Sequence, residues 1–440
     1  MPPARMPGRI GFITKFVRNP LEVIPQAAYE EDYVAFGGVR APRAWVTSPS
    51  MIKAVLLDER DKFRKLMQIR LLGPLLGKGI LTSEGADWKW QRQASAPMFR
   101  PQTLGAFVPA FVRAADDTLA RWRVAPGSIQ SVDDDMARAT FDVISATLLP
   151  SADQALAHQM QDSIRALQRH GGWDLLYASL SFPAWVPRPG MVRAYEAMRS
   201  LRDAVARLLA RQRDSGKDDL LQRLVAARDP ETGRAMDDHQ LVDNLLTFYL
   251  AGHETTARAL AWTLYVLARS AHWTAALQEE IERVTAGAPI EARHIEGLVL
   301  VQQVLKESMR LYPPVPMMSR QAVADAVIEG REIRKGASIL MPIYAIHRHA
   351  KRWERPDEFD PTRFAPEKEA AIPRYQYMPF GAGPRVCIGM SFAMMEATAI
   401  LATLVRHARF ETAGEDPVPV ARVTLLPKGG VNLRVIPAPD

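Results

Sequence analysis

Hydrophobic residues recur at intervals of three and four along most of the chain, and this spacing predicts a mainly helical protein. The longest regular run follows Asp237 and Asp238, either of which can cap a helix, and it continues without a proline for about 30 residues. At roughly 1.5 Å per residue, such a helix would cross a whole domain. Its apolar positions are Leu241, Leu245, Leu246, Tyr249, Leu250, Leu260, Leu264 and Leu267.

Strands are predicted only in short stretches near the two ends of the chain. The two predicted hairpins are Tyr33–Phe36 with Ala44–Thr47, and Val423–Leu426 with Val431–Val435. Residues 63–83 are apolar but are interrupted by Gly73, Pro74, Gly77 and Gly79, which predicts an irregular segment. We therefore expect a mainly α fold with a small β-sheet region. Residues 1–440 would form one domain, with a short flexible N-terminus of about residues 1–20.

Composition narrows the class of protein. The chain is 48% hydrophobic and 24% charged, as in ordinary globular proteins. No apolar run reaches the roughly 18–20 residues of a membrane span, and residues 1–16 lack the apolar core of a secretion signal. A single cysteine excludes an intrachain disulfide, so we expect a cytoplasmic protein. The net charge of +7 is dispersed, which favours a basic patch for an acidic protein over nucleic-acid binding.

The candidate chemistry begins with Cys387, the only cysteine among 440 residues. It lies in a loop from Phe380 to Gly389 whose glycines and proline predict a shaped turn, and a helical pattern begins at Met390. A thiol at a helix N-terminus has a lowered pKa and can act as a nucleophile or a metal ligand. A lone cysteine can equally be a small buried hydrophobe, so the loop alone leaves both interpretations open.

A second candidate lies inside the long predicted helix, in the sequence Ala251-Gly252-His253-Glu254-Thr255-Thr256. Glycine and paired threonines are poor helix formers, and such a local violation often marks a functional site. A threonine hydroxyl can bond back to a helix carbonyl or turn to a ligand, and Glu254 adds an acid among apolar residues. The alternative is a kinked core helix with Glu254 in a salt bridge.

Two further pairs are ambiguous by themselves. Trp88 and Arg92 are four residues apart, so an indole N–H and a guanidinium share one helix face. They would suit a carboxylate ligand, or they could simply stack. Glu307 and Arg310 are neighbours at i and i+3, and one pair of this kind carries little weight.

Together these motifs resemble the cytochrome P450 family. The loop has the order Phe-x-x-Gly-x-Arg-x-Cys-x-Gly with every defining position filled, and Ala-Gly-x-Glu-Thr, Trp-x-x-x-Arg and Glu-x-x-Arg are present. The resemblance extends over about residues 30–436 and favours the soluble bacterial type. Its one departure is Thr362, in place of the usual glutamate before Arg363. It implies a structural charge network of Glu307, Arg310 and Arg363.

The resemblance also implies where a cofactor lies and which residues serve it. Haem b would lie between the long central helix and the helix after the cysteine loop, with Cys387 as axial ligand of the iron. Glu254 and Thr255 would deliver protons during O2 cleavage. The other implied cofactor-binding positions are Trp88, Arg92, Ala251, Gly252, Arg320, Phe380, Gly381, Arg385 and Gly389. The implied substrate pocket comprises Met67, Leu71, Leu75, Val315, Met317, Met318 and Leu425.

The implied activity is a haem-thiolate monooxygenase that inserts one oxygen atom of O2 into a small apolar organic substrate. We expect no fused reductase domain, so electrons would come from a separate ferredoxin or flavodoxin and its NAD(P)H-dependent reductase. Alternatives are a haem-thiolate peroxygenase, isomerase or dehydratase, and a non-enzymatic haem-based gas sensor. A hydrolase with Cys387 as nucleophile would need a histidine base, which no motif places. Arg70 could anchor a substrate carboxylate or be an ordinary solvated charge.

Overall fold

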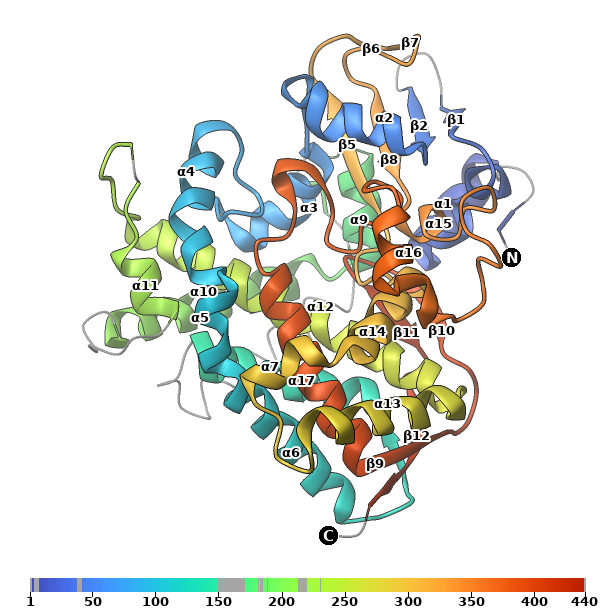
Figure 1. The fold of residues 1–440 in the computed structure, drawn as a ribbon. Helices are drawn as coiled ribbons and strands as arrows, with labels where there is room; N and C mark the ends of the chain where they lie inside the picture. The colour runs from blue at the N-terminus through green and yellow to red at the C-terminus, as the bar shows by residue number, and fades with distance from the viewer. Residues whose placement is uncertain are drawn as a thin grey trace.

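The computed structural model describes residues 2–3, 8–37, 42–148, 171–180, 182, 185–187, 189–212, 220–229 and 231–438. Figure 1 shows a mainly helical molecule with small sheets toward its periphery and the long helix α12 (Asp238–Ala268) in its middle. None of the helices in these ranges is long and apolar enough to cross a membrane.

The mainly α fold class is confirmed, although strands also form within residues 129–131 and 318–341, where none was predicted. Other α-helices of the described residues are α1 (Arg9–Arg18), α2 (Pro49–Lys53), α3 (Leu66–Leu76), α4 (Gly85–Ser95), α5 (Pro101–Leu104), α6 (Val108–Arg123), α7 (Val132–Leu148), α9 (Gly171–Ser179), α10 (Met191–Gln212), α11 (Leu220–Ala226), α13 (Ala271–Thr285), α14 (Val299–Leu311), α15 (Ile343–Ile346), α16 (Pro366–Ala371) and α17 (Met390–His407). The strands are β1 (Tyr33–Phe36), β2 (Arg43–Val46), β3 (Phe63–Arg64), β4 (Ile129–Ser131), β5 (Met318–Ala322), β6 (Ala326–Ile328), β7 (Arg331–Ile333), β8 (Ser338–Met341), β9 (Ala408–Thr412), β10 (Val418–Ala421), β11 (Leu425–Lys428) and β12 (Asn432–Pro437).

Helix α12 begins where the sequence predicts. The carboxylate of Asp237 accepts a hydrogen bond from the backbone N–H of Gln240 at 2.8 Å, and the Gln240 side chain accepts one from the Asp237 N–H at 3.3 Å. This capping box satisfies two N–H groups that a helix start leaves unpaired. The first part of α12 is buried in one core cluster with α7, α10 and α11. Its last part is buried in a second cluster with α6, α13, α14 and α17.

The largest sheet places its strands in the order β1-β2-β8-β5-β3. The predicted first hairpin is confirmed, because β1 and β2 pair antiparallel with Val34 opposite Trp45. Strand β8 joins β2 in parallel and β5 antiparallel, which brings the chain around Arg320 to the sheet interior. A second sheet, β4-β12-β9, lies at the opposite end of the molecule in Figure 1.

The predicted C-terminal hairpin is wrong. Strand β11 pairs with β10, whereas β12 pairs with β9 and β4. The turn before β12 does not fold the chain back, because the N–H of Val431 donates to the Asp133 carboxylate of α7 at 2.7 Å. Leu433 and Val435 are then buried beside α17 in the core. Burial and long-range pairing thus outweigh the local turn signal.

Two segments are more regular than expected. Residues 66–76 form α3 even though Pro74 lacks the N–H for a helix bond, and the N–H of Gly77 closes the helix on the Gly73 carbonyl at 2.9 Å. Part of the N-terminus that we expected to be flexible forms α1, and Phe16 of this helix is buried. Apolar contacts made by these segments, rather than local propensity, determine their conformation.

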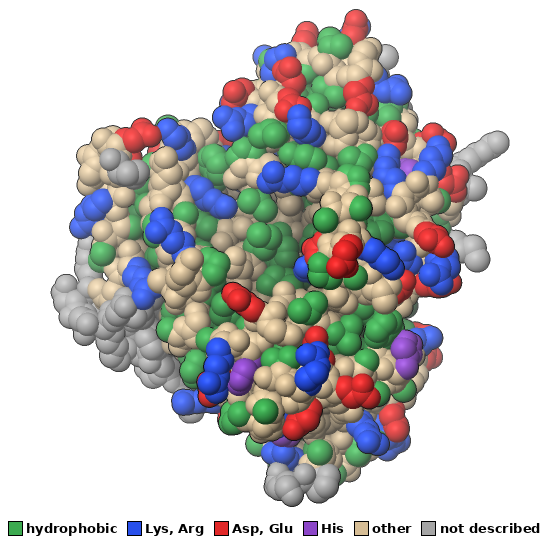
Figure 2. All heavy atoms as spheres, in the orientation of Figure 1, with side chains coloured by type: hydrophobic (Ala, Val, Ile, Leu, Met, Phe, Trp, Pro, Cys, Tyr) green, Lys and Arg blue, Asp and Glu red, His purple; other side chains and the backbone are tan. Residues whose placement is uncertain are grey.

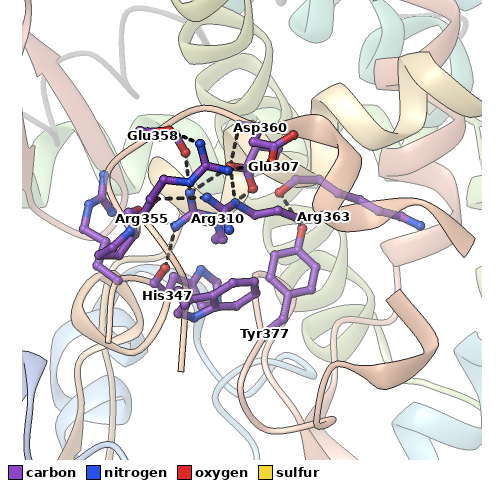
Figure 3. A network of polar contacts seen from close by, with 12 residues as sticks. Glu307, Arg310, His347, Arg355, Glu358, Asp360, Arg363 and Tyr377 are labelled. Carbon is purple, nitrogen blue, oxygen red and sulfur yellow. Dashed lines mark hydrogen bonds and ion pairs between the residues drawn. The ribbon is translucent and has the colours of Figure 1, made fainter. Parts of the chain in front are cut away.

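A buried charge network joins α14 to the segment before the cysteine loop (Figure 3). Glu307 and Arg310 are fully buried and share two hydrogen bonds of 2.7 Å. Glu307 also accepts from Arg363 at 3.3 Å and from the Asp360 N–H at 3.0 Å. Arg310 donates further to the backbone carbonyls of His347, Pro356 and Glu358. The predicted network of Glu307, Arg310 and Arg363 is therefore confirmed.

Removing one member of this network should destabilise the fold. In Arg310→Met, the Glu307 carboxylate would stay buried without its main partner, and we expect a loss of about 3–5 kcal/mol in the free energy of unfolding. Urea denaturation measures it. The control Lys53→Met removes an exposed ion pair with Asp58 and should cost less than ~1 kcal/mol. Equal losses for the two variants would contradict the structural role.

Candidate active site

A cavity of about 1100 Å³ lies between the cysteine loop and α12. Its mainly apolar wall includes parts of α3, α9, α10, β5 and the turn between β10 and β11. Figure 2 shows hydrophobic side chains around the hollow in the middle of the face drawn. The motif of residues 251–256 reaches this cavity because it falls between the two core clusters that bury the ends of α12.

The loop that carries Cys387 is fixed by backbone contacts. The N–H of Cys387 donates to the Phe380 carbonyl at 2.9 Å. Gly381 and Gly383 have φ values of +72° and +70°, in the left-handed region that favours glycine. A Cβ atom on Gly383 would lie 2.7 Å from the Leu56 carbonyl oxygen, so a side chain there would push the loop away. The loop therefore holds the thiol at the cavity wall.

The ionisation of Cys387 corrects a sequence expectation. Helix α17 does begin at Met390, just beyond the thiol. Nevertheless, burial raises the pKa of the Cys387 thiol, and the Gly389 N–H and the charge of Arg92, which both lower it, do not compensate. The lowered pKa expected from the helix N-terminus is wrong because desolvation of a thiolate outweighs that effect. The exposed part of the thiol opens onto the cavity, where a metal cation would hold it as a thiolate.

Cationic side chains surround this end of the cavity, namely Lys65, Arg92, Arg320 and Arg385. Burial, with the charges of Arg385 and Arg320, lowers the pKa of Lys65 to about 7. Burial also lowers the pKa of Arg320 to about 10 and that of Arg385 to about 10. The cations thus repel one another in a partly dry site. Sequence reasoning missed Lys65, because nothing in its neighbourhood separates it from a surface lysine.

The polar partners of these cations are mostly backbone carbonyls. Lys65 donates to the Leu81 carbonyl at 2.5 Å, Arg92 to Val386 at 2.9 Å and Arg320 to Ser319 at 2.8 Å. Among the described residues, Glu84 is the carboxylate that meets this group, at 3.0 Å from Arg385. The Arg385 guanidinium also lies 3.8 Å from the centre of the Trp88 ring. Glu84 neutralises only part of the positive charge of these four cations. The remaining charge suits a ligand that carries two carboxylates, as haem b does.

The opposite wall is the motif of α12. Thr255 Oγ1 donates to the Ala251 carbonyl at 2.6 Å, and Glu254 Oε1 accepts from Thr424 Oγ1 at 2.8 Å. Gly252 has a packing role that the sequence did not reveal, because a Cβ atom there would lie 3.0 Å from Ile144 Cδ1 of α7. The structure therefore brings an acid and a hydroxyl to the cavity wall that faces the thiol.

The two neighbouring residues of the motif differ: His253 does not line the cavity, whereas Thr256 does. His253 is buried, with Nδ1 3.0 Å from the Tyr249 carbonyl oxygen, as expected of a residue that is not a ligand. Thr256 bonds to Glu396 of α17, which is 1% exposed and whose pKa burial raises well above its ordinary value. Sequence reasoning missed Glu396. Its signal is a lone acid in the apolar pattern of the last long helix.

The structure places nearly all the expected residues around one space. All the expected cofactor-binding residues line the cavity, as do Met67, Leu71, Leu75, Val315, Met317 and Met318. Leu425 is the exception: it is fully buried in the core, and its neighbour Leu426 lines the cavity instead. Successive residues of a strand point to opposite faces, so only one of these two neighbours reaches the cavity. Arg70 also lines the cavity.

A thiol on one wall, an acid and a hydroxyl on the other, and a cationic rim between them define a haem-thiolate protein. Comparison with known proteins gives its family. Residues 28–433 match the family described as cytochrome P450. The crystal structure of the cytochrome P450DA heme domain is similar, with a TM-score of 0.84 and 25% identity over 100% of this chain and 97% of that one. The chain belongs to the cytochrome P450 family, binds haem and is a P450 monooxygenase.

Curated relatives cover most of the chain. Cyclooctatin synthase of Streptomyces melanosporofaciens is 28% identical over 98% of this chain and 93% of its own length. Cyclooctat-9-en-7-ol 5-monooxygenase of the same organism is 31% identical over 93% of this chain and 88% of its own. A cytokinin hydroxylase of Arabidopsis thaliana is 32% identical over 93% of this chain and 81% of its own.

The residues of one cavity wall would bind haem, and those of the other would deliver protons. When bound, haem supplies an iron centre for O2 activation. Cys387 would hold the iron, and the cationic rim would hold the propionates. On the other wall, Glu254 would offer an exchangeable proton and Thr255 would offer a hydroxyl to pass it on. The apolar walls between them exclude water from the reacting groups.

Replacing Lys65 should change how the stability of the haem-free protein depends on pH. Burial lowers the pKa of Lys65 from its ordinary value of 10.5 to about 7 in the folded protein. The unfolded chain has the ordinary value, so it binds the proton of Lys65 more tightly than the folded protein does. Stability therefore rises between pH 7 and pH 10, and the charged lysine destabilises the fold below pH 7. We expect Lys65→Met to raise the melting temperature at pH 6 by about 2–4 °C and to flatten its rise toward pH 10.

The same substitution should have the opposite effect on the haem-loaded protein, because Lys65 would lose a propionate partner. Transfer of haem to an excess of apomyoglobin should become faster. The exposed Lys53→Met variant serves as the control in both measurements. If the melting temperature of Lys65→Met depends on pH in the same way as that of the unaltered protein, Lys65 does not belong to the charged rim.

Proposed function

We propose that the enzyme inserts one oxygen atom of O2 into a small, apolar organic substrate and reduces the other atom to water. The observation that carries this proposal is the pair of Glu254 and Thr255 on the wall opposite Cys387, in an otherwise apolar cavity. Cleavage of O2 consumes protons, and an acid beside a hydroxyl is a suitable source for them. Glu254 and Thr255 are thus the proposed catalytic residues.

The size and lining of the cavity support an apolar substrate. The cavity has a volume of about 1100 Å³, and the wall formed by α3 presents mostly aliphatic and methionine side chains. Gln68 and Arg70 are the polar residues of α3 on this wall. The names of two relatives refer to cyclooctatin and cyclooctat-9-en-7-ol. They favour a screen that includes polycyclic hydrocarbons and their alcohols.

Electrons would come from a separate ferredoxin or flavodoxin with its NAD(P)H-dependent reductase, in the cytoplasm. The net charge of +7 favours an acidic partner. Lys89 of α4 and Arg100, which follows α4 in the chain, are both exposed, and Lys89 pairs with Glu231 at 2.8 Å. We propose this basic surface as the docking area. The whole of residues 1–440 would act as one catalytic domain.

The alternatives have less support. A peroxygenase that uses hydrogen peroxide directly has no need of an acid–hydroxyl pair, and neither does a gas sensor. An isomerase or dehydratase consumes no electrons. A hydrolase with Cys387 as nucleophile would need a histidine base, and no histidine lines the cavity among the described residues.

The ligand assignment is tested with purified, haem-loaded protein. After reduction and addition of carbon monoxide, we expect the red-shifted Soret band of a thiolate-ligated haem. Cys387→Ala should abolish that band while leaving the far-ultraviolet circular dichroism unchanged. An unshifted band in the unaltered, haem-replete protein would refute the ligand assignment.

The proton-delivery assignment is tested by counting products. With a surrogate ferredoxin and reductase, Thr255→Ala should release several times more hydrogen peroxide per NAD(P)H, because O2 is cleaved less efficiently without the hydroxyl. Thr255→Ser keeps a hydroxyl and should stay close to the unaltered enzyme. If Thr255→Ser and Thr255→Ala release equal amounts of peroxide, the hydroxyl has no part in the relay.

A further inference from the structure

The turn between β10 and β11 touches the proposed catalytic acid. Thr424 lies in this turn and is 3% exposed, and its Oγ1 donates to Glu254 Oε1 at 2.8 Å. No other side-chain hydrogen bond or ion pair to Glu254 is formed by the described residues. The Glu254 carboxyl therefore has a single side-chain partner among the described residues, a hydroxyl from a segment 170 residues away in the sequence.

The turn itself is held firmly on both sides of Thr424. The N–H of Arg422 bonds to the Thr424 carbonyl at 2.9 Å, and the N–H of Leu425 bonds to the Pro314 carbonyl at 2.9 Å. Trp262 of α12 donates to the Leu425 carbonyl at 3.2 Å. These bonds fix the backbone of Thr424 relative to α12, two turns away from Glu254. The hydroxyl is thus placed by the fold and does not depend on a flexible side chain.

Other charged groups near Glu254 have partners of their own or face elsewhere. His253 is buried on the opposite side, against the Tyr249 carbonyl. Arg258, one turn further along α12, lies 3.8 Å from the Asp133 carboxylate. Arg422, in the same turn as Thr424, donates to the carbonyls of Ala421 and Arg18. Thr424 is therefore the group that decides how the Glu254 carboxylate is held.

We propose that Thr424 is a positioning residue for proton delivery: its hydroxyl holds Oε1 of Glu254 so that Oε2 is the oxygen that takes up and releases the proton. The proton leaves Oε2 toward the Thr255 hydroxyl, and a proton from solvent replaces it on the same oxygen. This role rests on the function proposed above.

The position of the turn gives this contact a second consequence. Ala421, Arg422, Val423 and Leu426 line the same cavity as Thr424. A substrate that presses on this turn therefore touches the element that holds the acid. The turn between β10 and β11 therefore links the occupancy of the cavity to proton delivery by Glu254.

The test follows the Glu254 carboxyl directly, by infrared difference spectroscopy of haem-loaded protein, with Glu254→Gln used to assign the band. In Thr424→Val, we expect the carboxyl C=O stretching band of Glu254 to move to higher frequency, since the group loses its hydrogen-bond donor. Thr424→Ser should restore the original value. Thr412→Val, at an exposed position of β9, is the matched control and should change nothing. An unshifted band in Thr424→Val overturns the proposal.

A double-mutant cycle separates positioning from general damage to the fold. Thr424→Val should release more hydrogen peroxide per NAD(P)H than the unaltered enzyme, but it should add nothing in the Glu254→Gln background. Additive losses would mean that Thr424 acts only through the stability of the turn. If Glu254→Gln itself leaves peroxide release unchanged, the proposed relay fails, whereas the infrared result still decides whether Thr424 holds the carboxyl.

Discussion

The structure depends on a charge imbalance around a thiol that lines a recessed cavity. Cys387 lies in a site where burial raises the thiol pKa, and cations crowd the adjacent wall with Glu84 as the carboxylate among them. In the protein alone, each of these groups is in an unfavourable environment. Iron would stabilise the thiolate, and two propionates would neutralise the cations. The fold holds these desolvated groups in place before haem binds. Haem binding is therefore favoured, because the iron and the propionates remove the unfavourable environment of the thiol and the cations.

Holding such a site requires rigid support. The loop around Cys387 has little freedom, because Gly383 touches the backbone of Leu56 and the Cys387 N–H is bonded within the loop. Behind it, the Glu307–Arg310 pair is fully compensated by neighbouring backbone groups. On the other side, α12 is fixed at both ends by separate core clusters and is left uncovered only where the acid and hydroxyl are needed.

Local sequence signals predicted some of these features well. The capping residue and the length of α12 follow from its own sequence, because capping and apolar spacing are local effects. The cysteine loop and the Glu307 network were found from motifs in which the residue types are tightly constrained by geometry. The C-terminal hairpin failed because the partner of β12 is decided by burial beside α17. Lys65, Glu396 and the pKa of Cys387 could not be predicted, since each depends on neighbours distant in sequence.

The wrong prediction for Leu425 concerns a residue of the expected substrate pocket. Sequence reasoning placed a leucine of the last segment in the pocket, and the residue type and region were right. Strand β11 pairs with β10, and of its two neighbouring leucines Leu426 lines the cavity while Leu425 is buried in the core. The same pairing brings Thr424 to Glu254. The contact between Thr424 and Glu254 depends on how the strands pair. No pattern within either segment of the sequence predicts that pairing.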